Sequence, residues 1–217
     1  MSLKIDSEIK ALFISGTDTE IGKTYTCAAL LRAAALLGKK TVYFKPIETG
    51  VSPGKSIDGG IIQAYSPETL VESFYQFELP AAPYLAARLE KREISLKNIQ
   101  QAFLRLKKNY QPELILVEGA GGLLVPIKRE KTTLDLVKLL EIPVLLVSQN
   151  YLGTINHTLL SLEVLKKRKI EIAGFAFAYS NKIKAEPSVK ETNAQIIEEF
   201  SGVKFLGETE KILELVS

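Results

Sequence analysis

Cysteine, methionine and histidine each occur once in this 217-residue sequence, and tryptophan is absent. The single cysteine, Cys27, cannot form an intramolecular disulfide, and it offers no basis for a cysteine-ligated zinc site. The longest apolar runs fall well below the ~20 residues of a membrane-spanning helix, and the polar start MSLKIDSEIK does not resemble a signal peptide. We therefore expect a soluble, cytoplasmic protein without a membrane partner.

Charge of either sign is not concentrated anywhere along the chain. The 28 basic and 25 acidic side chains give a formal net charge of +3 and are interspersed, without a basic arm or stripe. This balance gives no reason to expect nucleic acid as a partner. Domains of ~100–250 residues fill one core, so we expect residues 1–217 to form a single domain.

Short runs rich in β-branched residues alternate with longer stretches of helical periodicity. This alternation is typical of an α/β fold with a doubly wound, mostly parallel sheet and helices on both faces. We predict strands at Ala11–Ser15, Thr41–Lys45, Leu114–Glu118, Val144–Ser148, Ala173–Ala178 and Val203–Leu206. We predict helices at Gly22–Leu37, closed by a left-handed Gly38, from an N-cap at Ser95 to Lys108, and from an N-cap at Thr154 to Arg168. Residues 51–83 show weak periodicity, and their structure is left open.

The segment GTDTEIGKT, residues 16–24, joins the first predicted strand to the first predicted helix. In this setting backbone N–H groups point at phosphate oxygens, Lys23 reaches the outer phosphates, and the Thr24 hydroxyl binds magnesium. The usual spacing places a glycine at position 17, whereas Gly16 comes one residue too early. The alternative is a strand-to-helix turn with an incidental Gly-Lys-Thr. The strand–loop–helix order favours a fold of the P-loop NTPase type that binds ATP or GTP.

Polar residues at the ends of the other predicted strands bear on the reaction, because ligands of a doubly wound sheet collect there. Lys45, in KPIETG, points toward the same crevice as Lys23, and two ammonium groups suit a phosphorylated or carboxylated intermediate. Glu118 ends an apolar strand, where a carboxylate is costly unless it meets a metal or a cation. A solvated strand-end lysine and a capping carboxylate are the structural alternatives.

Two other polar residues are less informative. Asp58 lies in the segment left open, and its local pattern is that of an exposed turn residue. His157, the only histidine, falls in the first turn of a predicted helix, where a surface or capping role competes with catalysis.

Four motifs in register, GTDTEIGKT, KPIETG, VEGAGGLLVP and LGTINHTLL, resemble the dethiobiotin synthetase family in order and spacing, over roughly residues 11–178. The resemblance implies ATP-dependent carboxylation of 7,8-diaminononanoate in biotin biosynthesis. CO₂ would form a carbamate, ATP would phosphorylate it, and the second amine would close the cyclic urea and release phosphate. Such a reaction needs positioning and cationic neutralisation more than an acid–base pair.

The resemblance also implies roles for individual residues. Lys45 would hold the carbamate and Lys23 the transferring phosphoryl group, as the two catalytic residues. Magnesium would be shared by Thr24, Asp58 and Glu118. The implied ATP-binding residues are Glu20, Ile21, Gly22, Lys23, Thr24, Tyr25, Asp58, Glu118, Gly119, Ala120, Gly121 and Asn181.

Substrate binding extends, by the same resemblance, across two subunits of a homodimer. Thr49 would bind the diamine. Gly121, Gly153 and Asn156 would help bind the far carboxylate of the substrate, partly from the second subunit. A helix N-terminus at this turn is a reasonable anion site.

Two departures from the family concern recognition of the base. The asparagine that reads adenine in the family aligns with Ala178, and Asn181 follows three residues later. A proline-containing nucleotide loop is expected after Leu-Gly-Glu near the C-terminus, but the segment LGETEK has no proline. We therefore expect relaxed selection of the base.

A positioning ATPase related to ParA and MinD is the alternative from a different functional class. Those proteins carry an additional lysine early in the P-loop, whereas this loop has Asp18 and no lysine before Lys23. The C-terminal segment ILELV is also too short and acidic for an obvious membrane-binding helix. The cobyrinic acid amidation family is a further enzyme alternative, but its members normally add a glutaminase domain with a nucleophilic cysteine, and this chain has neither the length nor a suitable Cys/His pair.

Overall fold

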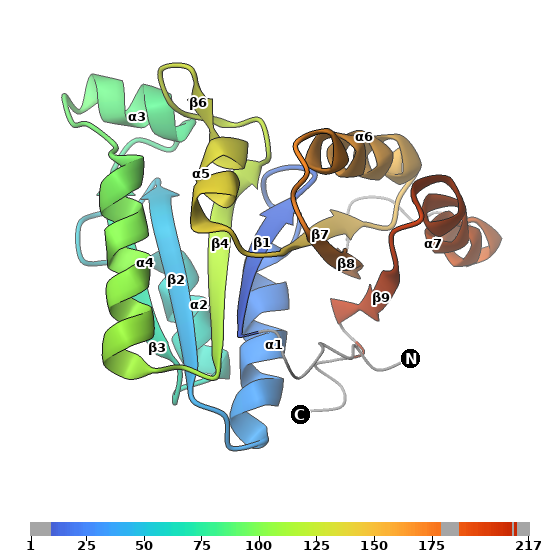
Figure 1. The fold of residues 1–217 in the computed structure, drawn as a ribbon, viewed down its shortest axis with the longest axis horizontal. Helices are drawn as coiled ribbons and strands as arrows, with labels where there is room; N and C mark the ends of the chain where they lie inside the picture. Colours follow the sequence, from blue (N-terminus) through green and yellow to red (C-terminus); the bar gives the residue numbers. More distant parts are fainter. Residues whose placement is uncertain (1–9, 179–186, 210, 212–217) are drawn as a thin grey trace.

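A seven-stranded sheet forms the centre of the molecule (Figure 1). The structure is a computed structural model that describes residues 10–178, 187–209 and 211. The strands lie in the order β3-β2-β4-β1-β7-β8-β9, and each of these pairings is parallel. Their bounds are Ala11–Gly16 (β1), Thr41–Thr49 (β2), Leu70–Phe77 (β3), Leu114–Gly122 (β4), Val144–Gln149 (β7), Ile172–Ala178 (β8) and Phe205–Glu208 (β9).

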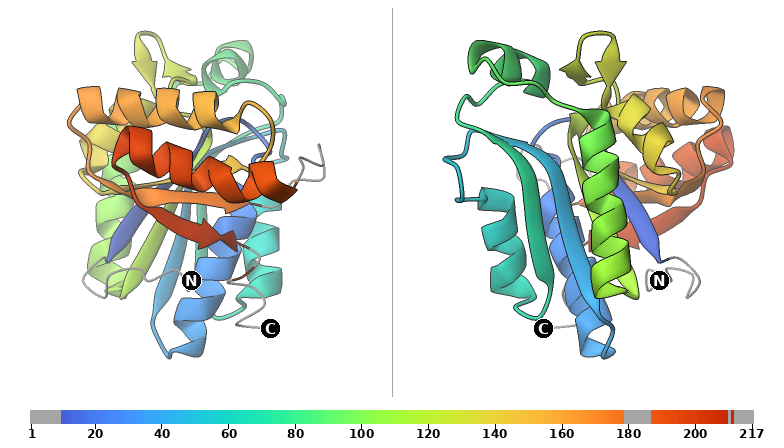
Figure 2. Two further views of the ribbon diagram at one scale, coloured as in Figure 1. Left: turned by 90° about the vertical axis from the view of Figure 1, so that its right-hand side faces the viewer. Right: turned by 60° about the vertical axis from the view of Figure 1, so that its left-hand side comes forward.

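Helices cover both faces of this sheet (Figure 2). On one face lie α1 (Lys23–Leu36) and α2 (Ile57–Tyr65), and on the other lie α4 (Leu96–Tyr110), α5 (Thr133–Leu140), α6 (Thr154–Lys167) and α7 (Pro187–Ser201). A short helix, α3 (Pro83–Leu89), and a two-stranded ribbon, β5 (Pro126–Lys128) and β6 (Lys131–Thr132), lie beyond the ends of β2 and β4 (Figure 1). Among the described residues, no helix is long and apolar enough to cross a membrane.

Alternation along the central strands assigns each side chain to one of the two helical layers. Tyr43 and Leu116 pack with α1, whereas Phe44 and Val117, the next residue of each strand, pack with α4 and α5. Because successive side chains of a strand point to opposite faces, Lys45 and Glu118 continue the rows of Tyr43 and Leu116. Both charged residues therefore lie on the α1 face, directly after Phe44 and Val117, the last residues at which β2 and β4 pair. The two strands continue to Thr49 and Gly122, four residues beyond the predicted ends at Lys45 and Glu118.

The predicted fold class is confirmed, and most helix boundaries agree with the prediction. Helix α1 is followed by Gly38 with a φ of 74°, and the Ser95 hydroxyl accepts a hydrogen bond from the Asn98 N–H as the N-cap of α4. The predicted N-cap at Thr154 is wrong. Gly153, with a φ of 102°, is the N-cap of α6, and the Thr154 hydroxyl instead lies 2.9 Å from that of Ser148 in the interior.

The segment left open from the sequence, residues 51–83, contains α2, β3 and the start of α3. Strand β3 is an edge strand whose residues, LVESFYQF, are mostly half-buried, so it lacks the apolar run that marks the central strands. The last strand begins at Phe205, two residues after the predicted start at Val203. Both differences occur at edges of the sheet, where burial constrains the sequence least.

Candidate functional site

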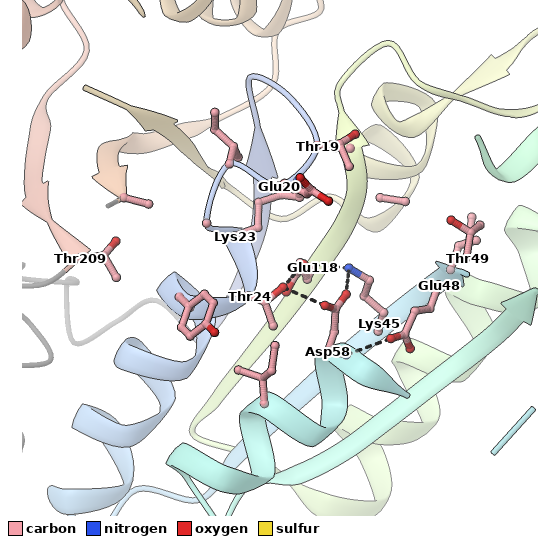
Figure 3. A pocket seen from close by; sticks show the side chains of 18 of the residues that line it. Thr19, Glu20, Lys23, Thr24, Lys45, Glu48, Thr49, Asp58, Glu118 and Thr209 are labelled. Carbon is pink, nitrogen blue, oxygen red and sulfur yellow. Dashed lines mark hydrogen bonds and ion pairs between the residues drawn. The ribbon is translucent and has the colours of Figure 1, made fainter. Parts of the chain in front are cut away.

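A cavity of about 530 Å³ opens at the carboxyl ends of the strands (Figure 3). Its lining comes from the loop after β1 and from the ends of β2, β4, β7, β8 and β9, together with one face of α2. The lining residues are Thr19, Glu20, Ile21, Gly22, Lys23, Thr24, Tyr25, Lys45, Ile47, Glu48, Thr49, Asp58, Ile61, Glu118, Ala120, Gly121, Gln149, Ala178 and Thr209. This is the crevice in which a parallel α/β sheet binds its ligands.

The loop after β1 is compact, and glycines permit its two closest approaches. Gly22 is the N-cap of α1 with a φ of 94°, and a Cβ atom there would lie 2.4 Å from the Ala178 Cβ. A Cβ atom at Gly16 would lie 2.6 Å from Ile21. Gly16 therefore permits the close approach of Ile21, one residue before the position at which the usual spacing places a glycine.

Lys23 folds back over this loop. Its Nζ atom donates to the Asp18 carbonyl oxygen at 2.9 Å, and the residue is buried. Burial lowers the pKa of the ammonium group, and the charge of Glu118 opposes this effect. A desolvated cation at the N-terminus of α1 is suited to neutralise an anion held by the loop.

Three oxygen ligands converge beside Lys23. The Thr24 hydroxyl, in the first turn of α1, lies 3.1 Å from Asp58 Oδ1 and 3.0 Å from Glu118 Oε1. Asp58 belongs to the first turn of α2, and Glu118 belongs to β4 (Figure 3). One hydroxyl and two carboxylates at this separation are hard oxygen donors of the kind that Mg²⁺ selects, so the residues fit this ion.

The Lys45 ammonium group joins the two carboxylates. Its Nζ atom lies 2.6 Å from Asp58 Oδ2 and 2.7 Å from Glu118 Oε1, and all three side chains are at least three-quarters buried. Burial alone lowers the pKa of Lys45, but the charges of Glu118 and Asp58 and their hydrogen bonds outweigh it and hold the pKa above its ordinary value. Lys45 therefore remains a cation in the buried end of the cavity.

A second layer of residues, which the sequence did not single out, supports the two carboxylates. The Tyr43 phenol donates to Glu118 Oε2 at 2.8 Å. The Glu48 carboxylate accepts from the Asp58 backbone N–H at 2.9 Å and from the Ser73 hydroxyl at 2.8 Å. The alternation of side chains along a strand predicts that Tyr43 and Lys45 share one face of β2. It does not predict that β4, which carries Glu118, lies next to β2.

The other predicted site residues do not all line the cavity. Residues 20–25, Thr49, Ala120 and Gly121 line the cavity, whereas Gly119 does not and packs against the Phe13 ring. Gly153 is also absent from the lining, and Asn156 lines a separate hollow between α6 and α7. Asn181 lies outside the described residues.

His157 lies on the exposed part of α6, away from the cavity. Its Nδ1 atom is 2.8 Å from the Tyr151 hydroxyl, in an exposed contact. The structure therefore gives it a surface contact and no place among the reacting groups.

Comparison with known proteins gives a consistent set of relatives. A family profile described as an AAA domain matches residues 10–217. The ATP-dependent dethiobiotin synthetase BioD of Thermodesulfovibrio yellowstonii is 38% identical, with 94% of this chain and 89% of the relative covered. The protein of the same name from Methanococcus vannielii is 36% identical, with 90% and 91% covered, and that from Francisella tularensis subsp. novicida is 39% identical, with 90% and 88% covered.

Solved structures share the architecture at much lower identity. A ParA family ATPase from Chlorobium tepidum has a TM-score of 0.57 at 9% identity, with 97% of this chain and 93% of that chain covered. The MinC:MinD cell division complex of Aquifex aeolicus has a TM-score of 0.59 at 13% identity, with 92% and 80% covered. At such identities the likeness shows the fold alone.

Proposed function

This chain belongs to the ATP-dependent dethiobiotin synthetase family, and we propose that its strand-end cavity carries out the family's ring closure, with Lys45 and Lys23 as the two catalytic cations. It is an ATP-dependent ligase of biotin biosynthesis. The observation that carries the proposal for the residues is the position of Lys45. Its buried ammonium group lies beside the P-loop and is bonded to Asp58 and Glu118.

The proposed reaction joins CO₂ to 7,8-diaminononanoate in three steps. One amine attacks CO₂ and loses a proton, which gives a carbamate. A carbamate oxygen takes the γ-phosphoryl group of ATP, and ADP leaves. The second amine then attacks the carbon of this mixed anhydride, the bond from carbon to the phosphate oxygen breaks, and the cyclic urea and inorganic phosphate form. Each step requires alignment of anions, which fixed cations provide.

Lys45 is proposed to bind the carbamate, and Lys23 the transferring phosphoryl group. Support comes from their burial, since a cation removed from water attracts an anion more strongly than one at the surface. The raised pKa of Lys45 keeps it charged at neutral pH, so it acts as a clamp and not as a base. Thr49, on the cavity wall beyond Lys45, is proposed to contact the diamine.

Thr24, Asp58 and Glu118 are proposed to hold magnesium, which would neutralise charge on the phosphates when bound. Support comes from their separation, since Asp58 Oδ1 and Glu118 Oε1 lie 3.1 Å and 3.0 Å from the Thr24 hydroxyl oxygen, close enough for the three to bind one ion. Glu20 to Tyr25 are proposed to surround the phosphate chain, because they form the loop and first turn of α1.

A homodimer is part of the proposal, with Gly153 and Asn156 of one subunit serving the cavity of its partner. Support comes from their place at the start of α6, outside the cavity of their own chain. Light scattering of the purified protein tests the dimer, and a monomer that still forms product would contradict it.

The central experiment mixes the protein with diaminononanoate, ¹³C-bicarbonate, Mg²⁺ and ATP, and detects labelled cyclic urea by mass spectrometry. We expect one phosphate released for each labelled product. ATP turnover that needs neither the diamine nor bicarbonate, and that rises with DNA or lipid vesicles, would instead support a positioning ATPase. Absence of labelled product with folded protein refutes the proposal.

A further inference from the structure

We propose that Tyr43 is a positioning residue that orients Glu118 toward magnesium. Its phenol hydrogen-bonds one oxygen of the carboxylate and leaves the other oxygen directed at Thr24. This inference rests on the proposed function, in which Glu118 is a magnesium ligand. Tyr43 itself is not among the residues that line the cavity, so it acts through Glu118 and not on a substrate.

The two oxygens of Glu118 have different partners. Oε2 accepts from the Tyr43 phenol at 2.8 Å. Oε1 accepts from Lys45 Nζ at 2.7 Å and from the Thr24 hydroxyl at 3.0 Å. The contacts therefore separate one oxygen held in the interior from one presented to the cavity.

Sheet geometry explains how Tyr43 and Lys45 reach the same carboxylate. They are two residues apart on β2, so their side chains leave the same face of the strand. Strand β4 pairs with β2 so that Val117 lies opposite Phe44, which puts Glu118 beside this row. Tyr43 and Lys45 thus contact Glu118 from neighbouring positions on the same face of β2.

Burial makes the phenol hydrogen bond consequential. Glu118 is 1% exposed and Tyr43 is completely buried, so water cannot replace the phenol as a donor. The terminal torsion of a glutamate has a broad energy minimum, and the carboxylate plane is therefore set by its partners. Burial, and then the charge of nearby Glu118, raise the pKa of the Cys27 thiol, but a thiol is a weak hydrogen-bond donor and does not replace the phenol.

Partners of this kind typically change metal affinity or activity by about 10–100-fold when they are removed. We therefore expect Tyr43→Phe to weaken Mn²⁺ binding, measured by electron paramagnetic resonance in the presence of ATP, by about 10–100-fold. Binding of ATP in EDTA should stay within about twofold of wild type, because Tyr43 does not touch the cavity. The Mg²⁺ concentration for half-maximal product formation should rise in parallel, with the maximal rate recovered at high Mg²⁺.

Tyr75→Phe is the matched control, because the Tyr75 hydroxyl lies on the α4 face of the sheet, where it accepts a 3.2 Å hydrogen bond from the Ser95 N–H. A purely structural role for Tyr43 would lower the unfolding temperature of Tyr43→Phe without a change in its Mn²⁺ affinity, and Tyr75→Phe should keep the wild-type Mn²⁺ affinity. Mn²⁺ affinity within twofold of wild type in folded Tyr43→Phe overturns the inference.

Two further measurements keep the test decisive. Site-specific replacement of Tyr43 by p-aminophenylalanine keeps a hydrogen-bond donor at this position, so this variant is informative even if Tyr43→Phe does not fold. We expect it to have most of the wild-type Mn²⁺ affinity. Weak Mn²⁺ binding by the folded variant counts against the inference. The proposed function fails separately if the wild-type protein binds Mn²⁺ and ATP but makes no cyclic urea. The effect of Tyr43 on Mn²⁺ binding then still supports or refutes its role in orienting Glu118.

Discussion

Replacing Lys45 by methionine tests whether this ammonium group holds two buried carboxylates together. Methionine keeps an unbranched apolar stem but removes the charge. The Lys45 side chain is 6% exposed and that of Glu118 is 1% exposed, with Nζ 2.7 Å from Oε1. The variant therefore leaves Glu118 and Asp58 close together without the cation that they share.

The structure sets the size of the effect. Removal of one partner from a buried ion pair destabilises a protein by about 3–5 kcal/mol. Asp58 is 23% exposed, so water replaces part of its lost interaction, and we expect about 3 kcal/mol, at the lower end of this range. For a chain of this length, about 2–4 °C per kcal/mol converts the loss into a fall in Tm of roughly 6–12 °C.

Thermal unfolding followed by circular dichroism, in EDTA and in Mg²⁺, measures this change. An ion that binds only the folded state adds about 2.7 kcal/mol when its concentration is 100 times its Kd. In the variant, Mg²⁺ replaces Lys45 as the cation that neutralises the two carboxylates, so Mg²⁺ should reverse most of the fall in Tm. The wild-type protein should gain less, because Lys45 already neutralises them.

A surface ion pair provides the control. Lys167 Nζ lies 3.6 Å from the Glu163 carboxylate, and the two side chains are 73% and 58% exposed. Lys167→Met should therefore change the free energy of unfolding by less than about 0.5 kcal/mol. A fall in Tm for Lys45→Met in EDTA that does not exceed the fall for Lys167→Met would refute the reasoning.

Three further predictions concern pH, thiol reactivity and the backbone. Desolvation raises the pKa of Asp135, but hydrogen bonds from Thr132 and from its other neighbours outweigh this effect and lower the pKa. The ionised Asp135 carboxylate therefore stabilises the fold above the unfolded pKa of ~3.9, and this contribution is lost as the pH falls through the folded pKa. Asp135→Asn removes the capping box, so urea titrations should show a free energy of unfolding lower by about 1 kcal/mol at pH 7. The loss should become progressively smaller below pH ~4. Equal losses at pH 7 and at low pH would contradict this. Burial raises the pKa of the Cys27 thiol, so Cys27 should not react with a disulfide reagent at pH 8 in the folded protein but should react in guanidinium. Rapid reaction in the folded protein would show that the interior around Cys27 opens to solvent. Gly22→Ala strains a left-handed residue against Ala178, and calorimetry should show ATP affinity weakened by about 5–150-fold, from strain of about 1–3 kcal/mol. Unchanged affinity would mean that the loop adapts.

The order of strands along the chain was predictable because the central strands are continuously buried. β1 and β7 have no exposed residue, and their apolar runs identify parallel strands covered on both faces. β3 has no such run, since Glu72 and Gln76 alternate with apolar residues at the sheet edge. The structure of this segment was therefore left open from the sequence, because its burial is only partial.

The site was predictable where motifs are contiguous and less so where it depends on tertiary contacts. Lys23 and Thr24 follow from one loop, and Lys45 and Glu118 follow from polar residues that end the apolar runs of two predicted strands. Asp58 has no local signature, because α2 only brings it to Lys45 once β2 and α1 are in place. Support by Tyr43 depends on β4 lying next to β2, and neighbour order in a sheet is not encoded in any short segment.

The position of β4 also has a consequence for synthesis of the chain. β4 lies between β2 and β1 in the sheet, although its residues, Leu114–Gly122, follow those of both. While the ribosome adds the segment between Thr49 and Leu114, β1 and β2 have already been synthesised but lack the strand that joins them, so each has one edge without its partner. Insertion of β4 closes this gap and brings Glu118 to Tyr43 and Lys45 in the same event. The same strand therefore joins the two halves of the sheet that precede it in the chain and completes the contacts of Glu118 with Tyr43 and Lys45.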